Sequence, residues 1–225
     1  YQPDTDNFKV FNRDNSVIKT DFITAISESK NGDLLFADKK FLYRYSKQTS
    51  QISVLTQVFK EESFIKVIFE EANRIWVGSN QFGASLIDTE TLEVHSASKV
   101  NPWGVSLDIR ALHDIAVISG NYWLATNEGL IVLASNGRIL KRIQSDDLGV
   151  SEEVNSLSIS VVGNDIWVGT YIGLFLLSDA AESIISPDYH PNFLHLNSDT
   201  YSATGIPSAI VMRVIEDRTG VVWAA

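Results

Sequence analysis

The chain has 225 residues, 44% of them hydrophobic, which is enough to bury a substantial core and excludes a disordered segment. Its 28 acidic and 18 basic side chains give a formal charge of -10, which repels phosphate backbones and anionic lipid surfaces, so we expect no nucleic-acid partner and no membrane contact by this chain. Cysteine is absent, which excludes disulfides and cysteine nucleophiles, and the longest apolar runs fall far short of the roughly 18 to 20 residues of a membrane-spanning helix.

In chain order, the predicted elements repeat one plan: an apolar first strand, a polar turn, a second strand that is apolar on both faces, a tight turn, a third apolar strand and a hairpin to a more polar fourth strand. The first strands are "FITAI" at 22–26, "FIKVIF" at 64–69, "IRAL" at 109–112, "VNSLSISV" at 154–161 and "AIVMRVI" at 209–215. Turns are predicted at "KNGD" (30–33), "SKQTS" (46–50), "DTET" (88–91), "SNG" (135–137) and "DRTG" (217–220). One helical turn is expected around "SDAAES" at 178–183.

The second strand carries the motif that sets the repeat, as in "IWVGSNQFGASLID" at 75–88, "YWLATNEGLIVLA" at 122–134 and "IWVGTYIGLFLL" at 166–177. Aligning these segments places Leu35, Trp76, Trp123, Trp167 and Trp223 at one position, with successive spacings of 41, 47, 44 and 56 residues by subtraction. Two residues later comes Ala37, Gly78, Ala125, Gly169 or Ala225; a short polar residue follows at Asp38, Ser79, Thr126 and Thr170, and a turn glycine at Gly83, Gly129 and Gly173. We interpret these positions as a large wedge, a close backbone approach, a hydrogen bond at the strand end and a tight turn.

A tryptophan motif with this period is typical of the blades of a β-propeller, whose sheets stack face to face and need apolar side chains on both faces. A β-sandwich would show apolar and polar alternation and would not repeat one tryptophan motif. We therefore predict an all-β propeller segment over residues 1–225. Its parts are the end of a blade at 1–12, four blades at 13–59, 60–104, 105–144 and 145–200, and the start of a blade at 205–225.

The pattern G-x-x-W-x-x-T-x-x-G-L, preceded by E-D-x-x-G, resembles the two-component regulator propeller repeat. "VIEDRTGVVWAA" at 214–225 and "NDIWVGTYIGLFLL" at 164–177 match it, whereas "NGDLLFADKKFLYRY" at 31–45 departs from it. "YQPDTDNFKVF" at 1–11 resembles the strand after the glycine-leucine of a preceding blade. The resemblance implies that the chain is an arc cut from a larger, seven-bladed ring, with Trp223 at an unpaired edge; a closed five-bladed ring is the alternative.

The resemblance also implies a function. The propellers of this family are the extracytoplasmic sensor of membrane-bound receptors, followed by an immunoglobulin-like domain, one transmembrane helix and, most often, a histidine kinase; some relatives carry a diguanylate cyclase. The chain would then be a periplasmic, non-catalytic ligand-binding segment without a cofactor, whose full-length receptor forms a homodimer. Family members that sense glycan breakdown products make an oligosaccharide the leading ligand class.

Catalytic chemistry has little support in the sequence. The histidines are His95, His113, His190 and His195, and the last two are five residues apart without a third ligand nearby, so we expect no metal site. Carboxylate pairs at 61–62, 70–71, 146–147 and 152–153 fit a solvated surface better than a glycosidase site. A propeller lyase or glycosidase remains an alternative that convergent carboxylates or a His/Arg cluster would support, and a protein-binding platform is one that a flat, apolar loop face would support.

Binding residues are predicted in two sets of loops, those that join second to third strands and those that join one blade to the next. Trp103 lies outside the repeat and is either a sugar-stacking platform or a plug in a blade seam. Arg110 and Asn155, at the starts of first strands, either line the axial mouth or make structural hydrogen bonds. The candidates are Asn80, Trp103, Arg110, Asn127, Glu128, Asn155 and Tyr171, beside Gln81, Phe82 and Tyr201 in the same loops.

Overall fold

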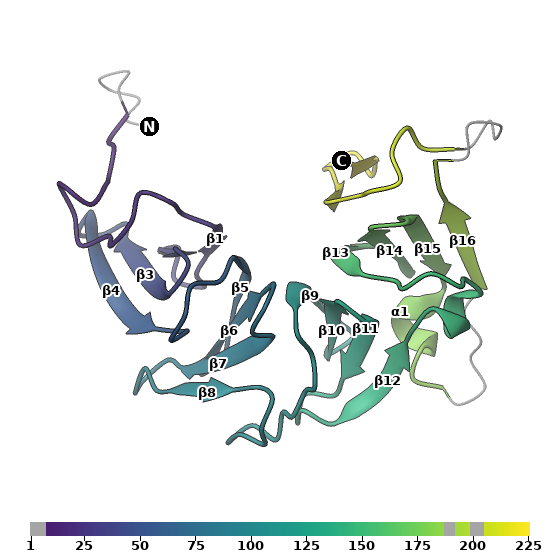
Figure 1. Ribbon diagram of the computed structural model, residues 1–225, viewed down its shortest axis with the longest axis horizontal. Helices are drawn as coiled ribbons and strands as arrows, with labels where there is room; N and C mark the ends of the chain where they lie inside the picture. Colours follow the sequence, from purple (N-terminus) through teal and green to yellow (C-terminus); the bar gives the residue numbers. More distant parts are fainter. Residues whose placement is uncertain (1–7, 187–191, 199–204) are drawn as a thin grey trace. The chain divides into compact units, whose positions relative to one another are not determined.

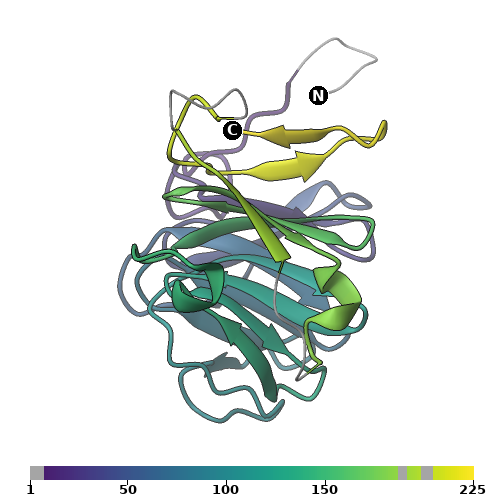
Figure 2. The ribbon, with the colours of Figure 1, turned by 90° about the vertical axis from the view of Figure 1, so that its right-hand side faces the viewer.

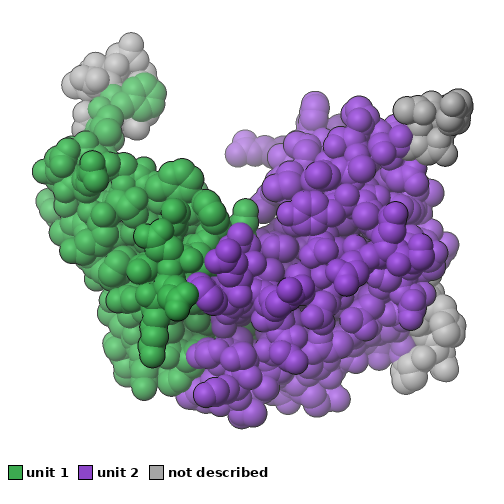
Figure 3. All heavy atoms as spheres, in the orientation of Figure 1, with its two compact units in different colours: residues 1–77, 85–95 green, residues 78–84, 96–225 purple. Residues whose placement is uncertain are grey.

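The computed structural model describes residues 8–186, 192–198 and 205–225. The chain divides into two compact units, residues 1–77 with 85–95 and residues 78–84 with 96–225 (Figure 3). Antiparallel sheets make up the described parts of both units (Figure 1). No helix in these parts is long and apolar enough to span a membrane.

Each complete sheet is a meander of four strands that pair in sequence order. The first contains β1 (Ala25–Glu28), β2 (Leu34–Ala37), β3 (Phe41–Ser46) and β4 (Gln51–Gln57), and the second contains β5 (Ile65–Glu71), β6 (Arg74–Ser79), β7 (Ala84–Asp88) and β8 (Val94–Ser96). The third contains β9 (Leu112–Ile118), β10 (Asn121–Thr126), β11 (Gly129–Leu133) and β12 (Ile139–Ile143), and the fourth contains β13 (Ser156–Val162), β14 (Asp165–Thr170), β15 (Gly173–Ser178) and β16 (Asn192–Leu196).

A two-stranded sheet, β17 (Val214–Glu216) and β18 (Val222–Ala224), follows in the second unit. Figure 2 shows this hairpin, in yellow, beside the fourth sheet, and β17 contacts β13 there. The helical turn expected at 178–183 is present as α1 (Ala180–Ser183). A 3-10 turn at Asp146–Leu148, which the sequence analysis did not predict, ends at Gly149 in the left-handed region.

The repeated second strand is buried as predicted in the complete sheets. Leu35, Trp76 and Trp123 are fully buried, and Trp167 is partly buried against Leu174 and its neighbours. Trp223 occupies the same repeat position but is 59% exposed, because β17 and β18 have no further strand or sheet packed over them among the described residues. The same motif therefore acts as a core wedge only where a second sheet covers it.

The tight turns after the second strands show why the repeat ends in glycine. In the third sheet the Thr126 hydroxyl donates to the carbonyl of Gly129 at 2.9 Å and accepts the N–H of Glu128 at 3.1 Å. Gly129 has φ +96°, and a Cβ there would collide with the carbonyl oxygen of Ile143 on β12. The glycine thus serves both the left-handed turn and the close approach of the fourth strand.

All five first strands begin later than the sequence predicted, and the shift is three residues or more in β1, β9 and β17. β9 starts at Leu112 rather than at 109, since Arg110 and Ala111 bond to a preceding turn instead of to β10. The N–H of Gly83 donates to the carbonyl of Arg110 at 2.7 Å, and Gly83 and Ala111 form an isolated parallel bridge. In the last sheet, residues 209–213 likewise precede β17, and the N–H of Val211 donates to the carbonyl of Thr170 at 2.9 Å. These backbone bonds tie one sheet to the next inside the second unit.

The strand expected at residues 1–12 is not formed in its described part, residues 8–12. Phe11 instead packs on the face of the first sheet, with its ring 5.7 Å from that of Tyr45. Residues 1–7 lie outside the described part of the chain. A side-chain contact with a sheet face, rather than backbone pairing with a sheet edge, therefore holds this segment.

Candidate functional site

A pocket of about 390 Å³ lies in the second unit, where the turns of three sheets meet the connections between them. This volume falls within the range of small-molecule binding sites. Amide, guanidinium, imidazole and phenol side chains dominate its lining, which consists of Asn80, Gln81, Arg110, Ala111, His113, Asn127, Asn155 and Tyr171. The pocket is therefore a polar hollow built at loops.

The repeat itself places three of these residues. Asn80, Asn127 and Tyr171 each follow the short hydroxyl residue that ends the second strand of a sheet. That hydroxyl fixes the turn, as when Thr170 donates to the carbonyl of Gly173 at 2.8 Å and accepts the N–H of Ile172 at 3.1 Å. The side chain at the next position is thereby held at the end of a rigid strand, where it can serve recognition rather than the core.

Asn127 is the best-defined group in the pocket. Its Oδ1 accepts the N–H groups of Arg110 at 3.1 Å and Ala111 at 2.9 Å, which joins the β10–β11 turn to the segment before β9. The residue is only 8% exposed, and its Nδ2 is buried without a hydrogen-bond partner among the described residues. Because both neighbours are donors, the oxygen must face them, and the amide NH2 is left with hydrogens to donate.

Two further bonds hold strand ends around the pocket, one between the third and fourth sheets and one within the fourth. His113 Nδ1 lies 2.9 Å from the carbonyl oxygen of Ser156, so Nδ1 carries a hydrogen and donates; in the neutral ring the lone pair is then on Nε2. The N–H of Tyr171 donates to the carbonyl of Asn155 at 3.3 Å. The Tyr171 side chain is 47% exposed, so its ring is available to a ligand.

Asp114, next to His113 in β9, supports the strands beneath the pocket. Its Oδ2 accepts the N–H of Ile159 on β13 at 3.1 Å and lies 3.4 Å from the guanidinium of Arg213. Burial raises the pKa of this carboxyl group above its usual value, although Arg213 and the backbone donors Ile159 and Ile115 oppose the rise. The carboxyl group thus links three successive parts of the second unit: β9, β13 and the segment before β17.

The structure brings five of the seven predicted binding residues around this pocket. These are Asn80, Arg110, Asn127, Asn155 and Tyr171. Glu128 is exposed on the same turn as Asn127 but is not a lining residue. Gln81 also lines the pocket, whereas Phe82 does not, and Tyr201 lies outside the described residues.

Trp103 lies elsewhere. A Cβ on Gly137 would be 2.7 Å from the carbonyl oxygen of Trp103, so the turn that contains Trp103 packs on the β11–β12 hairpin. That hairpin is at the opposite end of β11 from Asn127. The residue is partly buried, and its backbone N–H donates to Asn101 Oδ1 at 3.1 Å. This packing against a hairpin separates Trp103 from the pocket.

His113 lines the pocket although no pattern in the sequence marks it as a binding residue. His195 stacks on Phe175 with ring centroids 4.2 Å apart, and its Nε2 lies 2.7 Å from the carbonyl oxygen of Ile172. His190 lies outside the described residues. Over the described ranges, no three His, Asp or Glu side chains gather in a way that could hold a metal ion.

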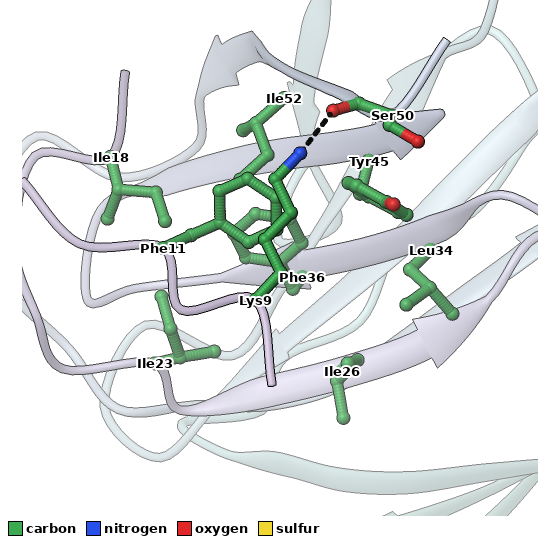
Figure 4. Close-up of a pocket in the computed structure, with 10 residues that line it drawn as sticks. All are labelled: Lys9, Phe11, Ile18, Ile23, Ile26, Leu34, Phe36, Tyr45, Ser50 and Ile52. Carbon is green, nitrogen blue, oxygen red and sulfur yellow. Dashed lines mark hydrogen bonds between the residues drawn. The ribbon is translucent and has the colours of Figure 1, made fainter. Parts of the chain in front are cut away.

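A second pocket, of about 400 Å³, lies on the face of the first sheet in the other unit (Figure 4). Figure 4 shows Phe11 over Phe36, and Lys9 Nζ donating to the carbonyl of Ser50 at 3.4 Å. Its lining is mainly aliphatic and aromatic, with Ile26 67% exposed. Few polar groups converge there, so we interpret this pocket as an uncovered sheet face rather than as a specific ligand site.

No protein-family model matches the sequence, and a search of curated proteins gives no significant match. The fold, in contrast, has close counterparts among solved structures. The extracellular domain of BT4673 from B. thetaiotaomicron, a protein described as a one component system, superposes with a TM-score of 0.67 at 17% identity, over 92% of this chain and 27% of that one. The chain has a β-propeller fold.

Two other structures agree. The extracellular domain of BT3049 from B. thetaiotaomicron, described as a hybrid two component system, gives a TM-score of 0.65 at 16% identity over 90% of this chain. PorZ, a surface component of the type-IX secretion system of Porphyromonas gingivalis, gives 0.62 at 16% identity over 90%. This chain spans 27% and 30% of their respective lengths. The four complete sheets are therefore propeller blades, and β17 and β18 are part of another.

Proposed function

We propose that this chain is an extracytoplasmic ligand-sensing segment of a membrane-bound two-component sensor histidine kinase and that it recognises a carbohydrate or another small ligand. One observation carries the proposal: turns from three successive blades and the connections between them surround one polar pocket of about 390 Å³. Rigid strands hold these turns, and the side chains on them are free to differ from blade to blade. Such a site suits recognition of a ligand.

The structural comparisons support the receptor context. Two of the matched structures are extracellular domains of proteins described as one component or hybrid two component systems. By analogy, the chain would lie in the periplasm, belong to a receptor that acts as a homodimer, and pass its signal to a cytoplasmic kinase. A diguanylate cyclase is the alternative output. Ligand binding would act by favouring one packing of the receptor over another.

A sugar ligand fits the side chains of the pocket. Asn80, Asn127 and Asn155 offer amide groups that can donate to and accept from hydroxyls. Tyr171 offers a ring face for the apolar side of a pyranose. A protein-binding platform would instead need a flat and apolar loop face, and the lining of this hollow is polar.

A propeller lyase is a second candidate, which one specific observation favours. His113 and Arg110 line the same pocket, and in the neutral ring of His113 the bond from Nδ1 to Ser156 makes Nε2 the basic nitrogen. No lining residue is a carboxylate, which does not favour a glycosidase. A lyase would convert its sugar to an unsaturated product, and absorbance of that product distinguishes turnover from binding.

The test is a screen of oligosaccharides against the full chain by thermal shift, followed by calorimetry on any that bind. A ligand that binds only the folded state raises the melting temperature. Tyr171→Ala should weaken the binding of a sugar that stacks on the ring by about 3- to 10-fold. Phe82→Ala is the matched control, since Phe82 is 42% exposed in the equivalent turn of another blade and does not line the pocket. Equal losses in both variants, or binding that neither variant affects, would contradict the proposed site.

A further inference from the structure

The hydrogen-bond donors with fixed positions in the pocket indicate which chemical groups a ligand should carry, which the blade fold alone does not. The Asn127 amide cannot rotate by half a turn without placing its NH2 against the N–H groups of Arg110 and Ala111. Its buried Nδ2 therefore needs an acceptor atom, and no described residue supplies one. An acceptor on a ligand would satisfy it, because buried polar groups in native proteins are almost always paired.

Arg110 supplies the second donor. Its backbone is held on both sides, since its N–H donates to Asn127 Oδ1 and its carbonyl accepts the N–H of Gly83 at 2.7 Å. Its side chain is exposed at the pocket, and within the described chain no carboxylate lies in ion-pair distance of its guanidinium. A guanidinium presents a planar pair of N–H donors that matches a carboxylate.

The charge of the lining is opposite to that of the chain. The chain carries a formal charge of -10, yet none of the eight lining residues is acidic and Arg110 is cationic. An anionic ligand would meet no lining carboxylate in this hollow and would neutralise an exposed cation. The remaining amides and the Tyr171 ring suit hydroxyls and the apolar face of a sugar ring.

We infer that the pocket binds a sugar acid of the uronate class, whose carboxylate pairs with the Arg110 guanidinium and one of whose oxygen atoms accepts the Nδ2 hydrogens of Asn127. This inference rests on the proposed function and names the class of its ligand. A neutral sugar would leave the cation of Arg110 without a partner, so the site should discriminate in favour of the acid.

The probes are the disaccharides of galacturonate, glucuronate and mannuronate, each measured beside the disaccharide of the corresponding neutral hexose. The two members of a pair differ only at C6, which is the carboxylate carbon of the acid and the hydroxymethyl carbon of the neutral sugar. Calorimetry on the full chain should show that at least one acid binds tenfold or more tightly than its neutral counterpart, as expected for a charge-assisted hydrogen bond of ~1.5–3 kcal/mol. Added salt should weaken the binding of the acid and leave that of a neutral sugar unchanged.

Three variants assign the effect to residues. Arg110→Gln should remove the preference for the acid, while Arg138→Gln, which changes an exposed arginine on the β11–β12 hairpin, should retain it. Asn127→Asp keeps an oxygen that accepts both backbone N–H groups. It replaces the amide NH2 that would donate to the ligand with a negatively charged oxygen, so the variant should lose binding of the acid. Circular dichroism and the melting temperature of each variant report whether it is folded.

The outcomes separate this inference from the proposed function. Equal affinity for acid and neutral sugars would overturn the carboxylate inference and leave a carbohydrate sensor intact. Binding of the acids with no loss in Arg110→Gln would overturn the assigned partner. If no sugar of either kind binds, the carbohydrate function fails together with the inference. Binding of acetate as tightly as of the uronates would show a carboxylate site without sugar recognition and would contradict the uronate class.

Discussion

Asn127 both stabilises the blade, through two hydrogen bonds to backbone N–H groups, and lines the pocket. Its replacement by alanine tests the contribution of these two bonds to stability. The substitution removes the Oδ1 atom that accepts the N–H groups of Ala111 at 2.9 Å and Arg110 at 3.1 Å. The bond to Ala111 is buried, and a buried donor left unpaired costs about 1–3 kcal/mol. The bond to Arg110 is part-buried, and its net loss costs about 0.5–1.5 kcal/mol. We expect the free energy of unfolding to fall by about 1.5–4.5 kcal/mol.

Urea unfolding, followed by tryptophan fluorescence and circular dichroism, measures this loss. Asn127→Asp retains an acceptor for both N–H groups and should lose less stability than Asn127→Ala. Glu128→Ala, at the exposed next position, should change the free energy of unfolding by no more than about 0.5 kcal/mol. A loss below about 1 kcal/mol in Asn127→Ala, or a larger loss in Asn127→Asp, would refute the role assigned to the two backbone bonds.

Other substitutions test the repeat and the buried carboxyl group. Gly129→Ala should destabilise by more than about 1 kcal/mol, because φ is +96° and the new Cβ meets a carbonyl oxygen; Gly120→Ala, at φ +77° with open space around it, should cost less in the same urea assay. Trp123→Ala should cost about 3–5 kcal/mol, and Trp223→Ala, at the same repeat position but 59% exposed, should cost far less; similar losses would contradict the wedge interpretation. The raised pKa of Asp114 means that its contribution to stability is greatest below about pH 4 and is lost as the pH rises through the folded-state pKa. The urea midpoint of the native chain should therefore fall relative to that of Asp114→Asn between about pH 4 and pH 7, and a constant difference would contradict the effect of burial.

The blade plan could be predicted from the sequence because each strand has a chemical signature that depends on near neighbours. Trp76 and Trp123 lie in strands without polar alternation, and both are fully buried. Thr126 and Thr170 make the turn bonds that short hydroxyl residues at a strand end favour. Local chemistry also placed Asn127 and Tyr171 in turns, and one repeat position then brought them to the same pocket.

The remaining features depend on contacts between segments that are distant in the sequence. The start of β9 shifts because Arg110 and Ala111 pair with the turn at Gly83, which no pattern within residues 109–112 reveals. Trp103 stands out in the sequence, yet its turn packs on the hairpin at Gly137. The role of His113 depends on the carbonyl of Ser156 in the next blade. The repeat in the sequence therefore predicts the strands of each blade, but it does not predict the bonds between blades.

The most direct test of the proposed binding site is a crystal structure of the chain with the sugar that binds most tightly in the screen. We expect electron density for that sugar in the pocket of the second unit, with an oxygen atom within hydrogen-bond distance of Asn127 Nδ2 and the ring over Tyr171. Density on the apolar face of the first sheet, or at Trp103, with the pocket at Asn127 lacking sugar, would contradict it.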